Sequence, residues 1–397
     1  MSITRRQAIH QLSMWALASP LLAEFENEVA RSVFQPDRIG PLDELVNVFE
    51  LEEVARKKLP QPLYNHIAGG VGAEYTLRRN REFFTRITFR PRMLVDVSEM
   101  DLSIDLFGSK LFAPILAGPS ANHGRLHAEA ESATVRGAEA AASAAVISRR
   151  SSHSIKEIAS QTLTPLWFQA DAEITADITR REINQAVDAG CRVICLSIGN
   201  NRPGILERDI HSRRLTPDTK LMENSDPSTL KNVWPPNPAQ LRKYGGPKLA
   251  WNLVDQVKGW SKLPVILRGV MSREEAKDAI DNGIDGLVVS NYGGRTIDGV
   301  AATIEVLPAI ADEVDGRVPI FIDGGFRRGV DILKGLALGA SAVWLGRPIL
   351  WGLASYGAEG VEKVLRLLQM ELALAMGLSG KRNLQAIDRS LVKIDRW

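Results

Sequence analysis

Gly286-Leu-Val-Val-Ser-Asn-Tyr-Gly-Gly-Arg295 is the stretch around which the rest of the chain is organised. Its apolar run ends abruptly in small and polar residues, which is typical of a buried parallel strand that opens into a functional loop. Two later stretches repeat this pattern, Phe321-Ile-Asp-Gly-Gly-Phe-Arg-Arg-Gly329 and Val343-Trp-Leu-Gly-Arg-Pro348. Three successive strand ends therefore bring glycine and arginine to one rim, and this combination indicates a site for an anion.

From Pro114 onward the chain repeats one unit: an apolar run, a turn and an amphipathic helical pattern. The apolar runs are residues 114–118, 144–148, 165–169, 192–197, 264–268, 286–290, 319–323 and 341–346. Clear helical patterns lie between them at residues 128–142, 177–189, 272–282 and 330–338, and the last two end in the C-cap pairs Asn282-Gly283 and Leu338-Gly339.

Eight such units predict a (β/α)₈ TIM barrel. The alternative, a doubly wound open sheet, would usually carry a Gly-x-Gly-x-x-Gly turn after its first strand, and the sequence has none there. One long interruption, residues 200–250, is rich in proline and charge and follows the fourth strand. We interpret it as a lid over the mouth of the barrel.

The N-terminal residues differ from the rest of the chain. Arg5-Arg6 precedes a weakly apolar run from Ala8 to Ala23, which predicts a twin-arginine signal and export to the periplasm; without such a signal the protein would be cytoplasmic. Residues 24–92 are interpreted as a helical extension, with an amphipathic segment from Leu42 to Ala55 and an extended segment from Phe83 to Arg92. Residues 93–397 then form the barrel.

The composition limits the classes of function. The 397 residues are 45% hydrophobic and 24% charged, as expected for an enzyme with a sizeable core. A net charge of +2 does not favour binding to nucleic acid, and no stretch approaches the roughly 18 apolar residues of a membrane span. Both cysteines, Cys191 and Cys195, lie in or beside an apolar strand and are predicted to be buried packing residues.

The strand ends carry groups that could bind a phosphorylated heteroaromatic cofactor. In a barrel, the loops after the seventh and eighth strands bind phosphate, and here they contain Arg327 and Arg347 among glycines. Other strand ends offer hydrogen-bonding groups to a flat ring, namely Ser120, Gln169, Ser197, Arg268 and Ser290. Arg268 is placed to stabilise a ring that becomes anionic on reduction.

From about Leu42 to the C-terminus, the chain resembles the FMN-dependent α-hydroxy-acid oxidases and dehydrogenases, the glycolate and lactate oxidase family. The similar motifs include Arg90-Pro-Arg-Met-Leu94, Ala117-Gly-Pro-Ser-Ala121, Ser290-Asn-Tyr-Gly-Gly-Arg295 and the arginine-containing loops after the last two strands. The resemblance implies FMN as cofactor, bound by Ser120, Ala121, Gln169, Ser197, Arg268, Ser290, Asp323, Gly324, Gly325, Arg327, Gly346 and Arg347. No metal is implied, and homo-oligomers are common in the family.

The substrate side departs from the family pattern. Tyr292 occupies the position of the catalytic histidine, and Gly199 that of the aspartate which orients it. Further replacements are His66 and Asp171 for two carboxylate-binding tyrosines, Leu206 for an arginine (with Arg202 and Arg208 nearby) and Arg268 for a lysine; Arg295 is retained. Asp171 would repel a small anionic 2-hydroxy acid, which favours a neutral or cationic substrate.

We therefore expect an FMN oxidoreductase that passes hydride from a C–OH or C–NH carbon to flavin N5, with a small-molecule substrate other than glycolate or lactate. Tyr292 or a histidine, His66 or His123, would accept the proton; Tyr292 would need a pKa shifted far below 10, which Arg268 and Arg295 could provide. The electron acceptor is oxygen, a quinone or a redox partner. Two alternatives are a flavin-binding sensor or partner subunit without this chemistry, and a non-oxidative FMN enzyme such as an isomerase.

Overall fold

The computed structural model describes residues 40–172, 176–199, 204–215 and 250–395. The chain forms two compact units, Met1–Glu44 and Leu45–Trp397. In the first unit the described part contains one 3₁₀ turn, Leu42–Glu44. The expected twin-arginine segment and most of the expected lid lie outside the described residues, and the division of the chain at residues 23 and 92 stays a prediction.

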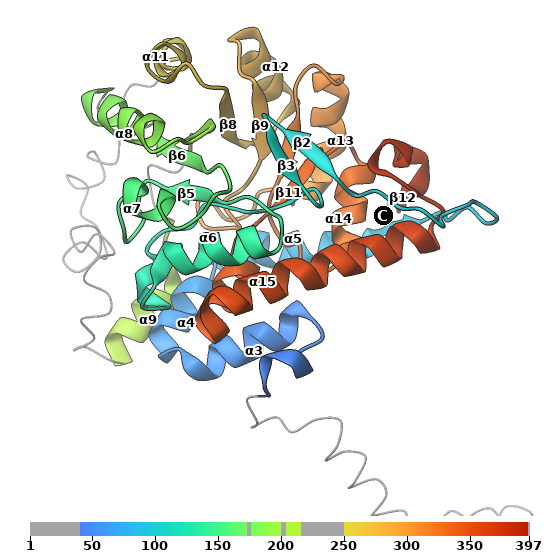
Figure 1. The fold of residues 1–397 in the computed structure, drawn as a ribbon, viewed down its shortest axis with the longest axis horizontal. Coiled ribbons are helices and arrows are strands. Elements are labelled where there is room, and N and C mark those ends of the chain that lie inside the picture. Colours follow the sequence, from blue (N-terminus) through green and yellow to red (C-terminus); the bar gives the residue numbers. More distant parts are fainter. Residues whose placement is uncertain (1–39, 173–175, 200–203, 216–249, 396–397) are drawn as a thin grey trace, which may run out of the picture. The chain divides into compact units, whose positions relative to one another are not determined.

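The second unit is built on a barrel of eight parallel strands (Figure 1). They are β4 (Ile115–Ala117), β5 (Val146–Ser148), β6 (Trp167–Asp171), β7 (Val193–Ser197), β8 (Val265–Val270), β9 (Gly286–Val289), β10 (Ile320–Ile322) and β11 (Ala342–Leu345). The order β4-β11-β10-β9-β8-β7-β6-β5 is closed by a parallel bridge between Ala117 and Ala145. Every strand overlaps its predicted apolar run, so the (β/α)₈ barrel is confirmed.

Helices follow the strands on the outside of the barrel. They are α6 (Ala130–Ala140), α7 (Ile155–Ala159), α8 (Ala176–Asp188), α11 (Asn252–Ser261), α12 (Arg273–Asp281), α13 (Thr303–Val314), α14 (Gly329–Ala337) and α15 (Arg347–Leu378), with α9 (Glu207–Leu215) between β7 and β8. Gly283 and Gly339 have φ values of +75° and +112° after α12 and α14, as their C-cap pairs predict. Across the described residues, none of the helices is long and apolar enough to cross a membrane.

The barrel interior is filled by large apolar side chains. Trp167, Phe321 and Trp344 are buried and meet at ring-centroid distances of 5.5 to 6.2 Å. A hairpin of β2 (Ile104–Leu106) and β3 (Ser109–Leu111) belongs to the same apolar cluster. Replacing one of these tryptophans by alanine would cost about 3–5 kcal/mol, because the neighbours could not refill the space. Cys191 and Cys195 are buried and free, as predicted.

The segment before the barrel supplies helices to the rim. It contains α3 (Val48–Lys58), α4 (Gln61–Ala68), α5 (Tyr75–Glu82), the 3₁₀ turn η2 (Phe83–Arg86) and β1 (Ile87–Phe89), which pairs antiparallel with β12 (Val392–Ile394). Short 3₁₀ turns also occur at His123–Arg125, Leu384–Ala386 and Arg389–Leu391.

Two sequence predictions for this segment were wrong in detail. The α-helix starts at Val48 and not at Leu42, because the Asn47 side chain accepts hydrogen bonds from the backbone N–H groups of Phe49 and Glu50. Residues 83–86 form a 3₁₀ turn, so only the part from Ile87 is extended.

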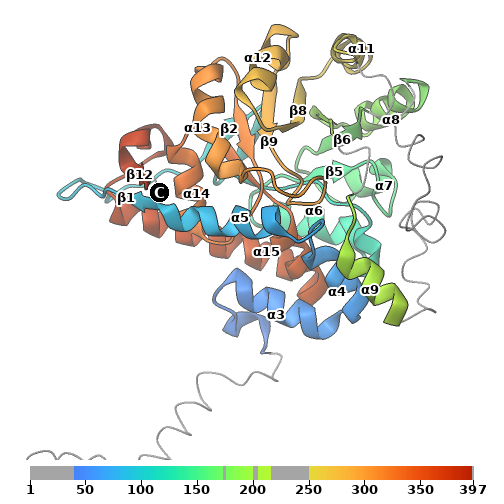
Figure 2. The same cartoon turned by 180° about the vertical axis from the view of Figure 1, so that it is seen from behind.

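Helix packing places α4 next to the barrel mouth. The long helix α15 packs against α3 and α6, and α4 packs against α9. Both views show α4 and α9 side by side (Figures 1 and 2). This contact brings α4, which lies near the start of the second unit, against α9, which lies in the connection after β7.

Candidate functional site

Arginines gather at the ends of β9, β10 and β11. Arg347 donates hydrogen bonds to the backbone carbonyls of Ile67 (2.7 Å), Gly69 (2.7 Å) and Gly293 (3.0 Å). Burial, together with the neighbouring Arg295 and Arg327, lowers the pKa of Arg347 to about 9. Burial likewise lowers the pKa of Arg327 to about 10. A largely buried guanidinium whose pKa is lowered by burial and by two neighbouring cations is a place where an anion gains strongly favourable interactions.

The glycine-rich loop after β10 has the backbone that its sequence requires. Gly325 has a φ of +84°, and a Cβ atom on it would lie 2.0 Å from the backbone oxygen of Asn80. No other residue fits that position without a shift of the chain. The loop therefore stays in a tight turn beside α5.

Asp323 connects the ends of three strands. It accepts hydrogen bonds from the guanidinium of Arg268 (2.7 and 3.1 Å) and from the hydroxyl of Ser290 (2.8 Å). The hydroxyl of Thr303 donates to its backbone carbonyl (2.5 Å). The charge of Arg268 is thus partly compensated by Asp323, and the three side chains hold one another in position.

Asp171 lies in a network that compensates its charge. Its carboxylate is 3.3 Å from Arg150 and 3.7 Å from Arg149, and it accepts a hydrogen bond of 2.7 Å from the Gln169 amide. Ser148 donates to the other end of that amide at 2.9 Å. Two arginines from the β5 loop therefore offset part of the charge of Asp171, although Arg149 also pairs with Glu182 at 2.6 Å, and the repulsion of an anionic substrate stays a prediction.

Tyr292 directs its hydroxyl into the protein backbone. The hydroxyl donates to the carbonyls of Ile198 and Arg268, the second at 3.0 Å. Gly269 allows this approach, since a Cβ atom there would lie 2.9 Å from the hydroxyl and its φ is +113°. The Arg268 guanidinium lies 4.7 Å from the Tyr292 ring centroid.

The pKa of Tyr292 moves in the direction opposite to the one a base would need. Burial raises it well above its ordinary value, and the nearby Arg268 offsets only part of that rise. The expected downward shift is therefore contradicted. Tyr292 also has a φ of +55°, which is uncommon for a bulky residue, so the surrounding loop holds it in this position.

His66 lies in the last turn of α4 and has a carboxylate partner. Its Nδ1 atom is 2.7 Å from Oδ2 of Asp209 on α9. Arg295 donates to the backbone carbonyl of His66 at 2.6 Å, and its second terminal nitrogen lies 3.5 Å from His66 Nε2. The structure thus brings together two of the predicted catalytic residues, His66 and Arg295.

Sequence reasoning missed Asp209. Asp209 stands three positions after Leu206, in the region where an arginine was expected. The spacing of residues along this segment gave no reason to single out Asp209. Arg208, which was considered for the missing cation, pairs instead with Glu74. Arg202 lies outside the described residues.

Comparison with known proteins identifies the family. The profile of FMN-dependent dehydrogenases matches residues 55–394. The chain belongs to that family. It is 37% identical over 358 residues to a peroxisomal (S)-2-hydroxyacid oxidase of Arabidopsis thaliana, covering 89% of this chain and 98% of the relative. It is 36% identical over 356 residues to glycolate oxidase of Spinacia oleracea, covering 89% and 96%.

Solved structures agree with this assignment. A structure of mandelate oxidase with (S)-2-phenylpropionate superposes with a TM-score of 0.79 at 34% identity, covering 89% of this chain and all of the other. Mandelate oxidase with benzoyl-formic acid gives a TM-score of 0.78, also at 34% identity, with the same coverage. The protein is an FMN-dependent oxidoreductase of the kind that acts on CH–OH groups.

The residues at the rim fit FMN. The cations Arg327 and Arg347 suit its phosphate, because burial lowers the pKa of each below its ordinary value and a bound anion would stabilise the charged forms. Ser197, at the end of β7, is fully buried, and its hydroxyl makes no well-formed hydrogen bond among the described residues, although it interacts with Tyr292 and lowers that residue's pKa; a polar atom of the ring would suit it. Ser120 and Ala121 follow β4 at the rim, partly buried and exposed respectively. The bound cofactor would supply a hydride acceptor.

His123 has a different environment from His66. It is buried, its Nδ1 lies 2.9 Å from the Thr134 hydroxyl, and its backbone N–H donates to Glu131. Burial lowers its pKa. These contacts join the 3₁₀ turn His123–Arg125 to α6, and they favour a structural role for this histidine.

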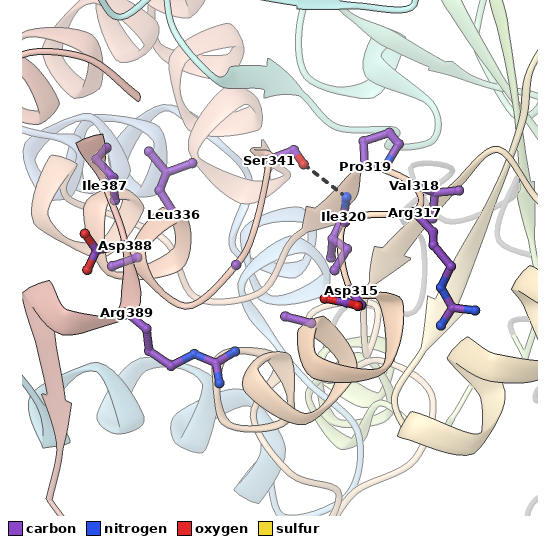
Figure 3. A pocket seen from close by; sticks show the side chains of 14 residues that line it. Asp315, Arg317, Val318, Pro319, Ile320, Leu336, Ser341, Ile387, Asp388 and Arg389 are labelled. Atoms are coloured by element: carbon purple, nitrogen blue, oxygen red, sulfur yellow. Dashed lines mark hydrogen bonds between the residues drawn. The ribbon is translucent and has the colours of Figure 1, made fainter. Parts of the chain in front are cut away.

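A hollow elsewhere on the barrel is separate from these groups. It has a volume of about 590 Å³ and lies where β10 begins, between the ends of α13 and α14 (Figure 3). Asp315, Arg317, Asp388 and Arg389 line it, and beside it the backbone N–H of Ile320 donates to the Ser341 hydroxyl. It contains none of the residues predicted to bind FMN or substrate, since those follow the opposite ends of the strands.

Proposed function

We propose that the protein oxidises the hydroxyl-bearing carbon of a 2-hydroxy acid other than glycolate or lactate, with hydride accepted at N5 of FMN. A C–OH carbon is favoured over C–NH, because Arg149 and Arg150 beside Asp171 weaken the reason to expect a cationic substrate. The replacements at residues 66, 171, 199, 206 and 292 change the side chains that would contact glycolate or lactate.

The observation that supports this proposal is the environment of the Arg295 guanidinium, namely its hydrogen bonds and its burial. Its guanidinium donates to the backbone carbonyls of His66 and Gly69, at 2.6 and 3.3 Å, and its second terminal nitrogen lies 3.5 Å from His66 Nε2. Burial lowers its pKa, and the more distant Asp209 only partly offsets the effect. A cation in this situation is stabilised by a substrate that brings its own carboxylate, through paired N–H···O bonds.

The test is anaerobic stopped-flow mixing of the FMN-loaded protein with a panel of small molecules. The panel contains glycolate, lactate, longer aliphatic and aromatic 2-hydroxy acids, the corresponding 2-amino acids, and alcohols without a carboxylate. We expect bleaching of the oxidised flavin by one or more of the longer 2-hydroxy acids, with slower reduction by glycolate and lactate. Faster reduction by an amine or a simple alcohol would contradict the proposal, and no reduction by any compound would favour a flavin-binding protein without this chemistry.

The same reduced enzyme identifies the electron acceptor. Mixing it with air-saturated buffer or with a soluble quinone shows which one returns the flavin spectrum at a useful rate. An oxidase reacts with oxygen, whereas a dehydrogenase reacts with the quinone or a partner protein.

We further propose that the protein forms homo-oligomers. The end of α15 exposes Leu374 (59%) and Leu378 (80%), and Met93 (80%) and Leu94 (fully exposed) lie on the loop that contacts Gly380 through Val95. Exposed apolar side chains gathered in this way are typical of interaction surfaces. Mass measurement in solution, before and after Leu378→Glu, tests the assignment.

A further inference from the structure

His66 and Asp209 form a histidine–carboxylate pair that is not at the position expected for this family. The two residues are 143 positions apart, and the packing of α4 on α9 brings Nδ1 within 2.7 Å of Oδ2. The Asp209 side chain is only 5% exposed, whereas that of His66 is 23% exposed. The carboxylate is therefore enclosed, and the imidazole is the partner that still reaches open space.

The pair determines which nitrogen of His66 carries the hydrogen. An ionised carboxylate only accepts hydrogen bonds, so Nδ1 must be the donor. In the neutral ring this leaves an electron pair on Nε2, which lies 3.5 Å from a terminal nitrogen of Arg295. The other carboxylate oxygen, Asp209 Oδ1, is buried without a hydrogen-bond partner among the described residues, so the carboxylate has capacity left to stabilise a charged imidazolium.

The free nitrogen of His66 faces the cation that would hold the substrate. Nε2 lies 3.5 Å from a terminal nitrogen of Arg295, and the same guanidinium donates to the His66 carbonyl. A carboxylate bound to Arg295 would bring the neighbouring hydroxyl-bearing carbon close to Nε2, since the two groups are on adjacent atoms of a 2-hydroxy acid. The charged groups that face the imidazole are Asp209 from α9 and Arg295 from the loop after β9.

We propose that His66 is the proton acceptor of the reaction and that Asp209 is its positioning residue. This inference rests on the proposed function. As the hydroxyl-bearing carbon becomes a C=O group, the hydroxyl O–H bond breaks and its proton passes to His66 Nε2. The C–H bond of that carbon also breaks, and its hydride passes to FMN. Asp209 holds the ring in the Nδ1–H form and stabilises the imidazolium that results, as buried carboxylates do in other histidine-dependent enzymes.

The position of Tyr292 explains why another residue takes this role. Its hydroxyl is already a donor to two backbone carbonyls, and ionising it would break both bonds and leave a phenolate against carbonyl oxygens. At Nε2, His66 has one long contact, 3.5 Å to a terminal nitrogen of Arg295, which a substrate carboxylate bound to that guanidinium could displace. The proposed acid–base pair therefore lies at other positions than the histidine and aspartate of the family, whereas Arg295 is retained.

Two measurements test the proposal on the FMN-loaded enzyme. The first is the limiting rate of anaerobic flavin reduction, with the apparent substrate Kd, for His66→Gln, Asp209→Asn and the double variant. We expect each single variant to lower the limiting rate by about 100-fold or more, and the double variant to lose little beyond that, because the two groups act as one unit. His211→Gln is the matched control, since His211 is an exposed residue of α9, the helix that carries Asp209. This substitution should leave the limiting rate and the substrate Kd unchanged.

The second measurement does not depend on activity. The chain has six histidines, so long-range ¹H–¹⁵N NMR spectra can be assigned by comparing the wild type with His66→Gln and His211→Gln. We expect His66 to be protonated on Nδ1 and bare on Nε2 when neutral, and Asp209→Asn to move the hydrogen to Nε2.

The outcomes separate the two proposals. If no compound reduces the flavin, the proposed function fails, and the NMR tautomer alone decides the state of the pair. An Nε2–H tautomer in the wild type would overturn the inference. So would a His66→Gln enzyme that keeps its limiting rate within about threefold and loses only substrate affinity, because that pattern belongs to a residue that binds and does not accept the proton.

Discussion

Replacing Tyr292 by phenylalanine removes one hydroxyl and keeps the ring over which Arg268 lies. The structure shows what that hydroxyl does: it donates to the carbonyls of Ile198 and Arg268. The Arg268 carbonyl also accepts the backbone N–H of Ile198 at 3.0 Å, so it stays hydrogen-bonded in the variant. The Ile198 carbonyl, on a partly buried residue, loses the hydroxyl, and one unsatisfied acceptor there costs at most about 1–3 kcal/mol of stability.

The expected effect on catalysis is small. A working general base contributes about 100- to 10,000-fold to the rate. Because burial raises the pKa of Tyr292, the hydroxyl stays protonated at neutral pH and cannot accept a proton. We therefore expect the limiting rate of flavin reduction in Tyr292→Phe to stay within about threefold of the wild type.

The assay combines anaerobic stopped-flow reduction with urea unfolding and a measurement of FMN content. Tyr75→Phe serves as the control, since Tyr75 is 45% exposed and its hydroxyl only accepts a hydrogen bond from Arg79. A loss of 100-fold or more in the reduction rate, with FMN content and folding intact, would refute the reasoning and return Tyr292 to the role of base.

Three further predictions concern other parts of the chain. Arg295→Lys should raise the Kd for the 2-hydroxy acid about 10- to 100-fold, because a lysine cannot make paired bonds to a carboxylate, and a substrate titration of flavin reduction measures it. The pKa of Arg347 in the folded protein is lowered to about 9, whereas the unfolded chain still holds that proton above pH 9. The FMN-free protein should therefore become more stable as pH rises above about 9, while its affinity for FMN falls. Unfolding measurements and FMN titrations at pH 7 to 10.5 check the rise in stability and the fall in affinity. Changing Arg5 and Arg6 together to lysine should abolish export if they form a twin-arginine signal, and cell fractionation detects the retained protein.

Much of the fold and the cofactor site could be predicted because both depend on local sequence patterns. A buried parallel strand is a short continuous apolar run, and a glycine that needs a positive φ must be a glycine wherever the loop stands. The eight strands and the arginines Arg327 and Arg347 were therefore found at their predicted places.

The catalytic side could not be predicted in the same way, because its chemistry depends on neighbours that are distant in sequence. Asp171 was expected to repel an anion, and the structure shows that Arg149 and Arg150, about twenty positions earlier, offset part of its charge. Helical spacing around Asp209 gives no sign that α9 packs on α4, so the partner of His66 was not visible.

By itself, the sequence determined the barrel, the family and FMN, because apolar runs, glycine turns and paired arginines each act over a few residues. Only the tertiary structure decided the state of the ionisable groups. Tyr292 is a hydrogen-bond donor locked to carbonyls, and His66 is held by a carboxylate 143 positions away. The pKa and the tautomer of a side chain are set by burial and by the charges around it, and those are properties of the folded chain.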